Sequence, residues 1–196
     1  MMMCLAANAQ LDRGVNQLGG VISVSTDKRP DGFTGNDVKT TIVSLNPTIG
    51  KFYRDNKLAG LHLIYYQNFQ STDQNETRAL GGGVFFRQYK TLGKSGFNIF
   101  AQEKLSVWFE KRKSTTGTNT LEVHEQNVAI SIVPALGYGV TKRLQVELFI
   151  PDLASIRYQH SDPQSDNLDD SSTLTFSTGI SQSIFTNVNV GLTWLF

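Results

Sequence analysis

The sequence predicts an all-β fold, an eight-stranded antiparallel up-and-down transmembrane β-barrel. Three observations predict it. Apolar and polar residues alternate with a period of two along most of the chain, which is typical of strands with two different faces. Long polar connections alternate with short ones, so the loops are sorted between the two ends of the strands. The polar positions carry mainly Gly, Ser, Asn, Thr and Gln. These residues would form a poor hydrophobic core, but they suit the polar interior of a small barrel.

Length and composition fit this fold. The 196 residues suit one domain, and a formal net charge of +1 creates no field that would gather nucleic acid. No run of about 18 uncharged apolar residues is present, so no membrane-spanning helix is expected. A spanning barrel keeps its mean hydropathy low because polar lumen residues alternate with the apolar ones.

The first residues have the features of an export signal. We interpret residues 1–9 as a residual signal-peptide segment and residues 10–196 as the barrel domain. Ala7-Asn8-Ala9, directly before Gln10, matches a small-residue cleavage pattern. The only cysteine, Cys4, lies in this segment, and a lipid anchor there is an alternative interpretation. The mature chain would then hold no disulfide framework.

Eight segments carry the alternation. Seven of them are residues 18–25, 43–50, 60–66, 80–87, 97–107, 127–137 and 144–150. The last, residues 174–196, keeps one parity throughout, so we expect a single eighth strand there. A membrane span needs only about 9–11 residues, and the N-terminal half of this strand is therefore expected to project beyond the bilayer.

The connections complete the pattern. The long polar ones are residues 26–39, 70–78, 112–125 and 159–173, and the short ones are 54–57, 93–96 and 141–143. Pro47 and Pro134 occupy equivalent places in two similar strands, Val43–Gly50 and Ile130–Gly137. Because proline cannot donate to a strand ladder, each is expected at a bulge or near the turn end of its strand.

The two faces predict different surroundings. Apolar residues should face lipid, because closure into a barrel removes the unpaired edges that lipid does not tolerate. The inward parity also carries four charges, which we expect to form an interior salt-bridge network, with a narrow ion path as the alternative: Arg87, Lys104, Glu147 and Arg157. Glu103 falls on the outward parity, so it should lie near a rim, or a bulge should shift the register.

The C-terminus carries a recognisable motif. A polar residue, Asn189, is followed by Gly191 and then by alternating hydrophobic residues that include Trp194 and end in Phe196. This motif is similar to the β-signal of outer-membrane barrels. The chain resembles, over residues 14–196, the small outer-membrane β-barrel domain proteins of Gram-negative bacteria with OmpX/OmpA-like architecture. The resemblance implies a cell outer membrane location, contact with outer-membrane lipid and lipopolysaccharide, and recognition of the last strand by the barrel-assembly machinery.

The sequence predicts no catalytic residue, no cofactor and no metal site. The most concrete enzyme alternative, a lipid-A-modifying one, would use His160 with Ser161 or Asp162; His62 is expected inward and His124 near a long loop. An acidic loop is expected to be solvated, with weak binding of a divalent cation as the alternative: Asp162, Asp166, Asp169 and Asp170. The basic run 111–113 is either a solvated rim or a contact for lipopolysaccharide phosphates.

These observations favour an outer-membrane barrel with a structural, adhesion or surface-recognition role through its extracellular loops and without catalysis. A monomer with a packed lumen and no sizeable pore is expected. A small porin-like channel is the first alternative, and it would need about ten or more strands or a loosely filled lumen. A lipid-modifying enzyme and a soluble lipocalin-type barrel are the others. The last would need apolar residues on the inward face.

Overall fold

The computed structural model describes residues 11–30, 37–70, 75–93, 95–116, 119–150, 153–164, 169–178 and 189–196. Its regular structure in these ranges is β-strand. The segments are β1 (Asn16–Pro30), β2 (Asp37–Arg54), β3 (Lys57–Gln70), β4 (Asn75–Thr91), β5 (Phe97–Thr116), β6 (Asn119–Gly139), β7 (Leu144–Phe149), β8 (Ala154–Pro163), β9 (Ser171–Thr178) and β10 (Asn189–Leu195). No helix in the described ranges is long and apolar enough to cross a membrane.

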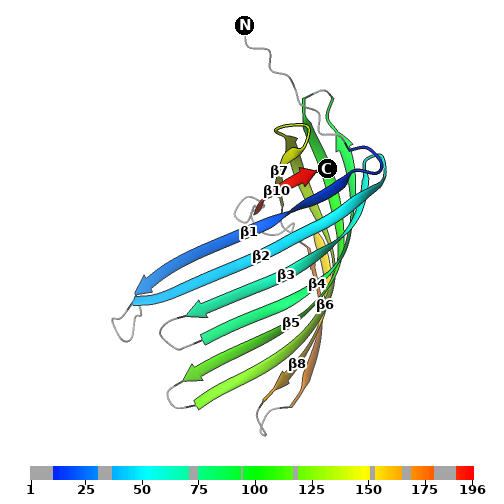
Figure 1. Cartoon of the computed structure of the whole chain (residues 1–196). Coiled ribbons are helices and arrows are strands. Elements are labelled where there is room, and N and C mark those ends of the chain that lie inside the picture. Colours follow the sequence, from blue (N-terminus) through cyan, green and yellow to red (C-terminus); the bar gives the residue numbers. More distant parts are fainter. Residues whose placement is uncertain are drawn as a thin grey trace.

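The segments form a closed antiparallel barrel (Figure 1). Each strand from β1 to β6 pairs with the next along the chain, and the ring is completed through β6–β7, β7–β10 and β10–β1. β7 and β8 follow one another along the edge of β6, and β9 and β10 continue the last strand in the same way. Ten segments therefore make eight strands in up-and-down order, which confirms the predicted eight-stranded antiparallel barrel.

The closure lies in the half of the barrel that holds the short turns. β1 pairs with β2 along its whole length, Asn16–Pro30, but with β10 only over Gln17–Val21. β9, on the loop side of the closure, pairs with β8. Residues 179–188, which separate β9 from β10, lie outside the described ranges.

The seventh strand contains an irregularity at its middle. Ala135 of β6 faces Phe149, whereas Ile132 faces Ala154, so three steps along β6 correspond to five along the seventh strand. Ile150 and Leu153 donate their backbone N–H groups to the carbonyls of residues 134 and 132 across this bulge, at 3.0 and 2.8 Å. Pro134 thus lies opposite a bulge, as its missing donor predicts.

Pro47 does not follow that expectation. Leu45 faces Tyr65 and Thr48 faces His62, so equal numbers of residues separate the pairs and no bulge occurs at Pro47, well inside β2. The opposing residue of β1, Gly20, accommodates it instead. Gly20 has a φ of +147°, and a Cβ atom there would lie 2.5 Å from the carbonyl oxygen of residue 46.

The prediction of one uninterrupted eighth strand is wrong. Thr178 faces Ala154 and Asn189 faces Phe149, so eleven steps on the last strand correspond to five on its neighbour. The six surplus residues rule out a single continuous ladder. Because six is an even number, the period-two parity is the same on both sides of the break and could not reveal it.

Several polar connections also prove shorter than predicted. β1 continues to Pro30, β5 continues to Thr116 and β6 begins at Asn119, so much of residues 26–39 and 112–125 is paired strand. These segments are mostly polar. Such a composition predicts a loop, but cross-strand pairs of polar residues sustain a ladder where both faces meet water.

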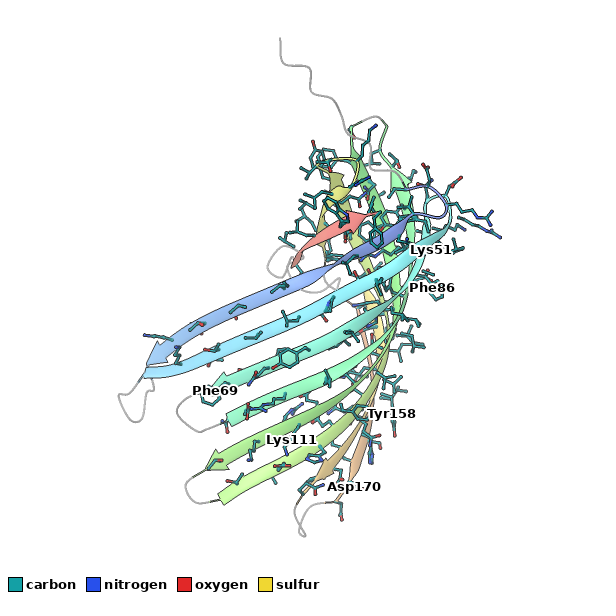
Figure 2. The ribbon with its side chains drawn as sticks, in the orientation of Figure 1. Lys51, Phe69, Phe86, Lys111, Tyr158 and Asp170 are labelled. Atoms are coloured by element: carbon teal, nitrogen blue, oxygen red, sulfur yellow. The ribbon has the colours of Figure 1, made fainter. Side chains whose placement is uncertain are left out.

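The two faces of the barrel differ as expected. Outward side chains are largely apolar and exposed, and Figure 2 shows Phe86 and Tyr158 projecting away from the barrel. Glu103 is exposed on this face, between Phe86 of β4 and Ile132 of β6. The ladders on both sides of β5 run through it without a shift, so the bulge explanation for Glu103 is wrong.

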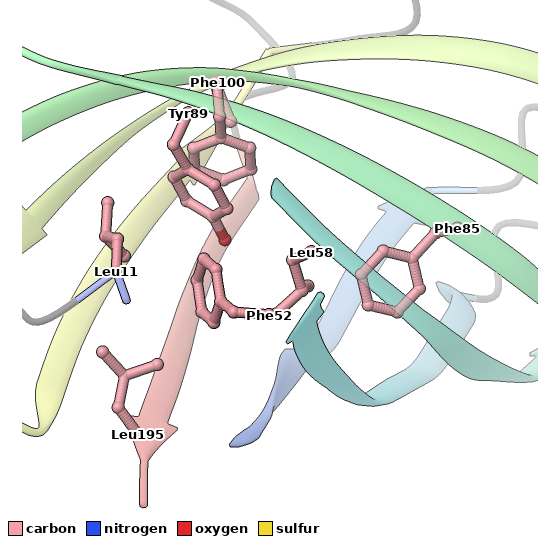
Figure 3. Close-up of a cluster of buried hydrophobic side chains, with 8 residues drawn as sticks. Leu11, Phe52, Leu58, Phe85, Tyr89, Phe100 and Leu195 are labelled. Atoms are coloured by element: carbon pink, nitrogen blue, oxygen red, sulfur yellow. The ribbon is translucent and has the colours of Figure 1, made fainter. Parts of the chain in front are cut away.

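The lumen is not polar throughout. At the turn end a buried hydrophobic cluster fills it (Figure 3), formed by Leu11, Phe52, Leu58, Phe85, Tyr89, Phe100, Ala135 and Leu195. The strand ends there are apolar on both faces, so alternation is lost. Leu11 closes this end: its carbonyl accepts the N–H of Asn56, which sits in a tight turn at a φ of 61°.

Candidate functional site

A buried ion pair crosses the lumen next to the hydrophobic cluster. Arg87 Nη1 donates to Glu147 Oε1 at 3.0 Å and to Oε2 at 3.2 Å, and both side chains are 1% exposed. Arg87 Nε donates to Gln102 Oε1 at 2.6 Å, and Nη1 also donates to the Tyr89 hydroxyl at 3.1 Å. Two of the four inward charges, Arg87 and Glu147, therefore form an interior salt bridge.

The strand register explains how these groups meet. Gln102 is the direct cross-strand neighbour of Arg87 on β5. Glu147 stands on β7 between Gly137 of β6 and Gly191 of β10, so neither neighbour carries a side chain beside it. The space that the glycines leave lets the Glu147 carboxylate extend across the lumen to Arg87.

Three aromatic rings surround the guanidinium. The Arg87 Cζ atom lies 5.0 Å from the ring centre of Phe85, 4.9 Å from that of Phe100 and 5.5 Å from that of Phe149. Such contacts favour a cation in a site without water. Together with the ion pair they form a plug, which we define as Arg87, Glu147, Gln102 and these rings.

A chamber with both polar and apolar walls lies on the loop side of the plug. It has a volume of about 310 Å³, and Arg87 and Gln102 line its floor. Its walls include Thr48 of β2, His62 of β3 and Lys104 of β5. Among the described residues that line it there is no Asp or Glu.

The other two predicted lumen charges have different surroundings. Lys104 lines the chamber together with Arg87. Arg157, on β8, is farther from the plug in sequence and structure: its Nε donates to Asn127 Oδ1 at 3.0 Å, and its Cζ lies 4.8 Å from the ring centre of Trp108. The four charges therefore do not form one network within the described part of the barrel.

Sequence reasoning missed several partners in the plug. Gln102 lies on the inward parity of its strand, and Phe85, Arg87 and Tyr89 alternate along β4, so their common face could have been inferred. Tyr89 and Trp108 also point inward: Tyr89 is buried in the hydrophobic cluster, and the Trp108 ring lies against the Arg157 guanidinium.

The basic run at residues 111–113 is split between the two faces. Lys111 is exposed and forms an ion pair with Glu122, which also lies 2.8 Å from His124 Nε2. Arg112 binds Glu110 at 2.9 Å and the buried Glu125 at 3.1 Å. Because successive residues of a strand point to opposite faces, the run does not make a single basic patch.

Carboxyl groups at the loop end are held in their charged form. The hydrogen bond from Arg78, at 2.5 Å, is the main reason why the pKa of Glu76 lies below its ordinary value. Hydrogen bonds from Lys111 and then His124 lower the pKa of Glu122 in the same way.

In the described structure, the residues named for the enzyme alternative do not form a catalytic triad. His160 and Ser161 are successive residues of β8 and point to opposite faces, and His160 Nδ1 lies 3.1 Å from Ser172 Oγ. Asp162 Oδ2 accepts a hydrogen bond from Gln164 at 3.1 Å. No group of three or more His, Cys, Asp or Glu in the described ranges could hold a metal ion, and Asp166 lies outside those ranges.

The residues of the C-terminal motif lie on the strand that closes the barrel. Trp194 and Phe196 are exposed on the outer face, whereas Gly191 points inward beside Glu147. The backbones of Phe196 and Asn16 exchange two hydrogen bonds, at 2.8 and 3.0 Å. Asn189, at the start of β10, lines the chamber. Residues 1–9, including Cys4, lie outside the described ranges.

Comparison with models of known protein families finds none that matches this chain, and comparison with curated proteins finds no match either.

Proposed function

We propose that this protein is an outer-membrane β-barrel of OmpX/OmpA-like architecture that anchors its polar connections at the cell surface. Its role would be structural, adhesive or recognitional through these loops, and the barrel itself would perform no catalysis. Outer-membrane lipid and lipopolysaccharide would surround it.

The observation that carries this proposal is the sidedness of the barrel. Large apolar side chains are exposed on the outer face of every strand pair, for example Ile49, Leu61, Ile130 and Leu192. The inner face buries charged and amide groups such as Arg87, Asn127 and Glu147. A water-soluble barrel needs the reverse arrangement, whereas a barrel in lipid needs this one.

The plug argues against a porin-like channel as the second candidate. The hydrophobic cluster and the Arg87–Glu147 pair together fill the lumen toward the turn end. An eight-stranded barrel leaves little more than the space that its side chains occupy. We therefore expect no steady large conductance from the protein in planar bilayers.

The C-terminal strand supports export to the outer membrane by its likeness to the β-signal. Exposed Trp194 and Phe196 are available on the outer face of the strand that must pair last to close the ring. We propose that the barrel-assembly machinery binds this strand before it pairs with β1.

The test compares one substitution on the lipid-facing band with a matched one at the loop end of the same strand. Ile130 is exposed between Leu105 and Ile156, and Ile130→Arg would place a cation in the apolar band. We expect it to destabilise the protein, folded into phospholipid vesicles, by about 2–4 kcal/mol. His124→Arg, on the same face of β6, should cost much less because His124 already lies among polar groups.

The measurement is urea unfolding of the full chain in vesicles, together with gel mobility of boiled and unboiled samples. A folded barrel that resists detergent migrates differently before boiling. Equal costs for the two substitutions, or a monomer that folds in plain buffer, would overturn the membrane assignment.

A further inference from the structure

Basic side chains at the loop end of the barrel gather across neighbouring strands rather than along one strand. On the outer face, Arg78 of β4 and Lys111 of β5 are direct cross-strand neighbours, and His124 of β6 is the next residue across. We call these three residues the basic row. The run at residues 111–113 does not reveal it, because that run alternates between the two faces of one strand.

The basic row brings two cations directly opposite one another, and such a pair destabilises a ladder. Arg78 and Lys111 are each turned toward a carboxylate nearer the loops. Arg78 Nε donates to Glu76 at 2.5 Å, and Lys111 forms an ion pair with Glu122. The two carboxylates therefore fix the directions of the two cations, although the cations stand side by side.

These ion pairs leave both cations able to bind a further oxyanion. A guanidinium and an ammonium group each carry several N–H donors, so a single carboxylate does not saturate either of them. A phosphate offers several acceptor oxygens and bonds strongly to such donors. Placed between Arg78 and Lys111, it would also offset their repulsion. The argument needs no unbalanced charge, since an ion-paired cation still donates.

A hollow of about 410 Å³ lies beside the basic row on the outer face. On the side toward the turn end it is bordered by Tyr65, Leu80 and Phe109, which are successive cross-strand neighbours on β3, β4 and β5. Leu80 is 67% and Phe109 61% exposed. The hollow thus has basic groups along one border and apolar groups along the other.

Two carboxylate residues also line the hollow, Glu110 and Glu125. Both belong to the inward parity of their strands, between the basic row and the apolar border. Their carboxylates bind Arg112, at 2.9 and 3.1 Å. They are therefore directed away from the outer face and do not compete with an anion at Arg78 and Lys111.

The hollow lies at the border of the apolar band. The next outward residues toward the turn end are apolar, for example Leu63 and Val107, whereas those toward the loops are Glu76, Lys113 and Glu122. A lipid whose acyl chain follows the apolar residues would have its headgroup at the basic row. Basic side chains at this level of a membrane attract anionic headgroups.

We propose that this hollow binds one lipid of the surrounding leaflet through a phosphate monoester, with the phosphate between Arg78 and Lys111 and an acyl chain over Leu80 and Phe109. The proposal rests on the proposed function, because it requires the outer face of the barrel to lie in a membrane. It adds the chemical class of the lipid that the loop end retains.

The experiment is native mass spectrometry of the full chain, folded in detergent micelles, with one compound added at a time. Phosphatidic acid is the probe, and we expect one molecule of it to stay bound. Phosphatidylcholine with the same acyl chains tests whether the apolar surface suffices, and glycerol phosphate tests whether the headgroup suffices. Equal retention of the two lipids, or equally tight binding of glycerol phosphate, would overturn the proposal.

Four variants test the assigned contacts. Arg78→Gln and Lys111→Gln should each lower the bound fraction of phosphatidic acid about three- to fivefold, as expected for one exposed ion pair. Phe109→Ala should lower it as well, while both cations stay in place. Lys90→Gln is the matched control, because Lys90 is an exposed lysine at the turn end of β4, and it should leave the bound fraction unchanged. An equal loss in Lys90→Gln, or no loss in the other three variants, would overturn the assigned site.

Gel mobility before and after boiling shows for each sample whether the barrel is folded. A folded barrel that retains no phosphatidic acid would refute this site and leave the membrane assignment intact. A chain that folds as a monomer in plain buffer would refute both.

Discussion

The Arg87–Glu147 pair allows a sharp test of how the lumen is stabilised. Both side chains are fully buried, and they come from strands 60 residues apart in the sequence. We predict that Arg87→Met and Glu147→Met each destabilise the barrel strongly, whereas the double variant is close to the unaltered protein. The reason is that each single change leaves one buried charge without its counterpart.

The structure also predicts an order between the two single variants. Without Glu147, the Arg87 guanidinium keeps Gln102, the Tyr89 hydroxyl and the aromatic rings. Without Arg87, the Glu147 carboxylate loses the donor of both hydrogen bonds that the described structure gives it. Within the usual cost of about 3–5 kcal/mol for breaking a buried pair, Arg87→Met should lie at the upper end and Glu147→Met at the lower end.

The assay is equilibrium urea unfolding of the full chain in phospholipid vesicles, followed by the fluorescence of Trp108 and Trp194. Lys111→Met is the matched control, because the Lys111–Glu122 pair is exposed at the loop end and should contribute at most about 1 kcal/mol. The double-variant cycle isolates the coupling between Arg87 and Glu147. If both single variants stay within about 1 kcal/mol of the unaltered protein, the plug is not held by this pair and our reasoning fails.

Three further predictions use the same unfolding assay or hydrogen exchange. Phe100→Ala, within the buried cluster, should cost about 3–5 kcal/mol, and Phe109→Ala, exposed on the outer face, clearly less; equal costs would contradict the cluster. Gly20→Ala should cost about 1–3 kcal/mol, because its φ of +147° disfavours a side chain, and an unaltered midpoint would refute this. The pKa of Glu122 is lowered in the folded protein, so its contribution to the stability of the loop end is present above the ordinary pKa of 4.5 and is lost as the pH falls further. Amide protection at the ends of β5 and β6 should therefore decrease below that pH. Glu122→Gln should remove this pH dependence.

Much of the architecture was predictable from local pattern. The alternation of Leu105 and Val107 with Lys104 and Ser106 assigns each residue to a face, because successive side chains of a strand point in opposite directions. The strand count followed from eight such segments. The outward position of Glu103 was also correct, although the bulge suggested to explain it is not there.

Pattern failed where pairing depends on a neighbouring strand. The break in the last strand leaves parity unchanged, and the absence of a bulge at Pro47 depends on Gly20 of another strand. The lengths of β5 and β6 were underestimated, because polar residues on both faces are as compatible with a paired strand outside lipid as with a loop.

The sequence by itself determined which residues face the lumen, since a period of two is a local property of an extended chain. It could not determine which of them meet. Arg87 reaches Glu147 rather than Arg157, and Lys104 shares a chamber with His62, because the stagger between strands sets the height of each inward residue along the barrel. That stagger exists only once the barrel has closed, so only the tertiary structure decided where the lumen is filled and where it stays open.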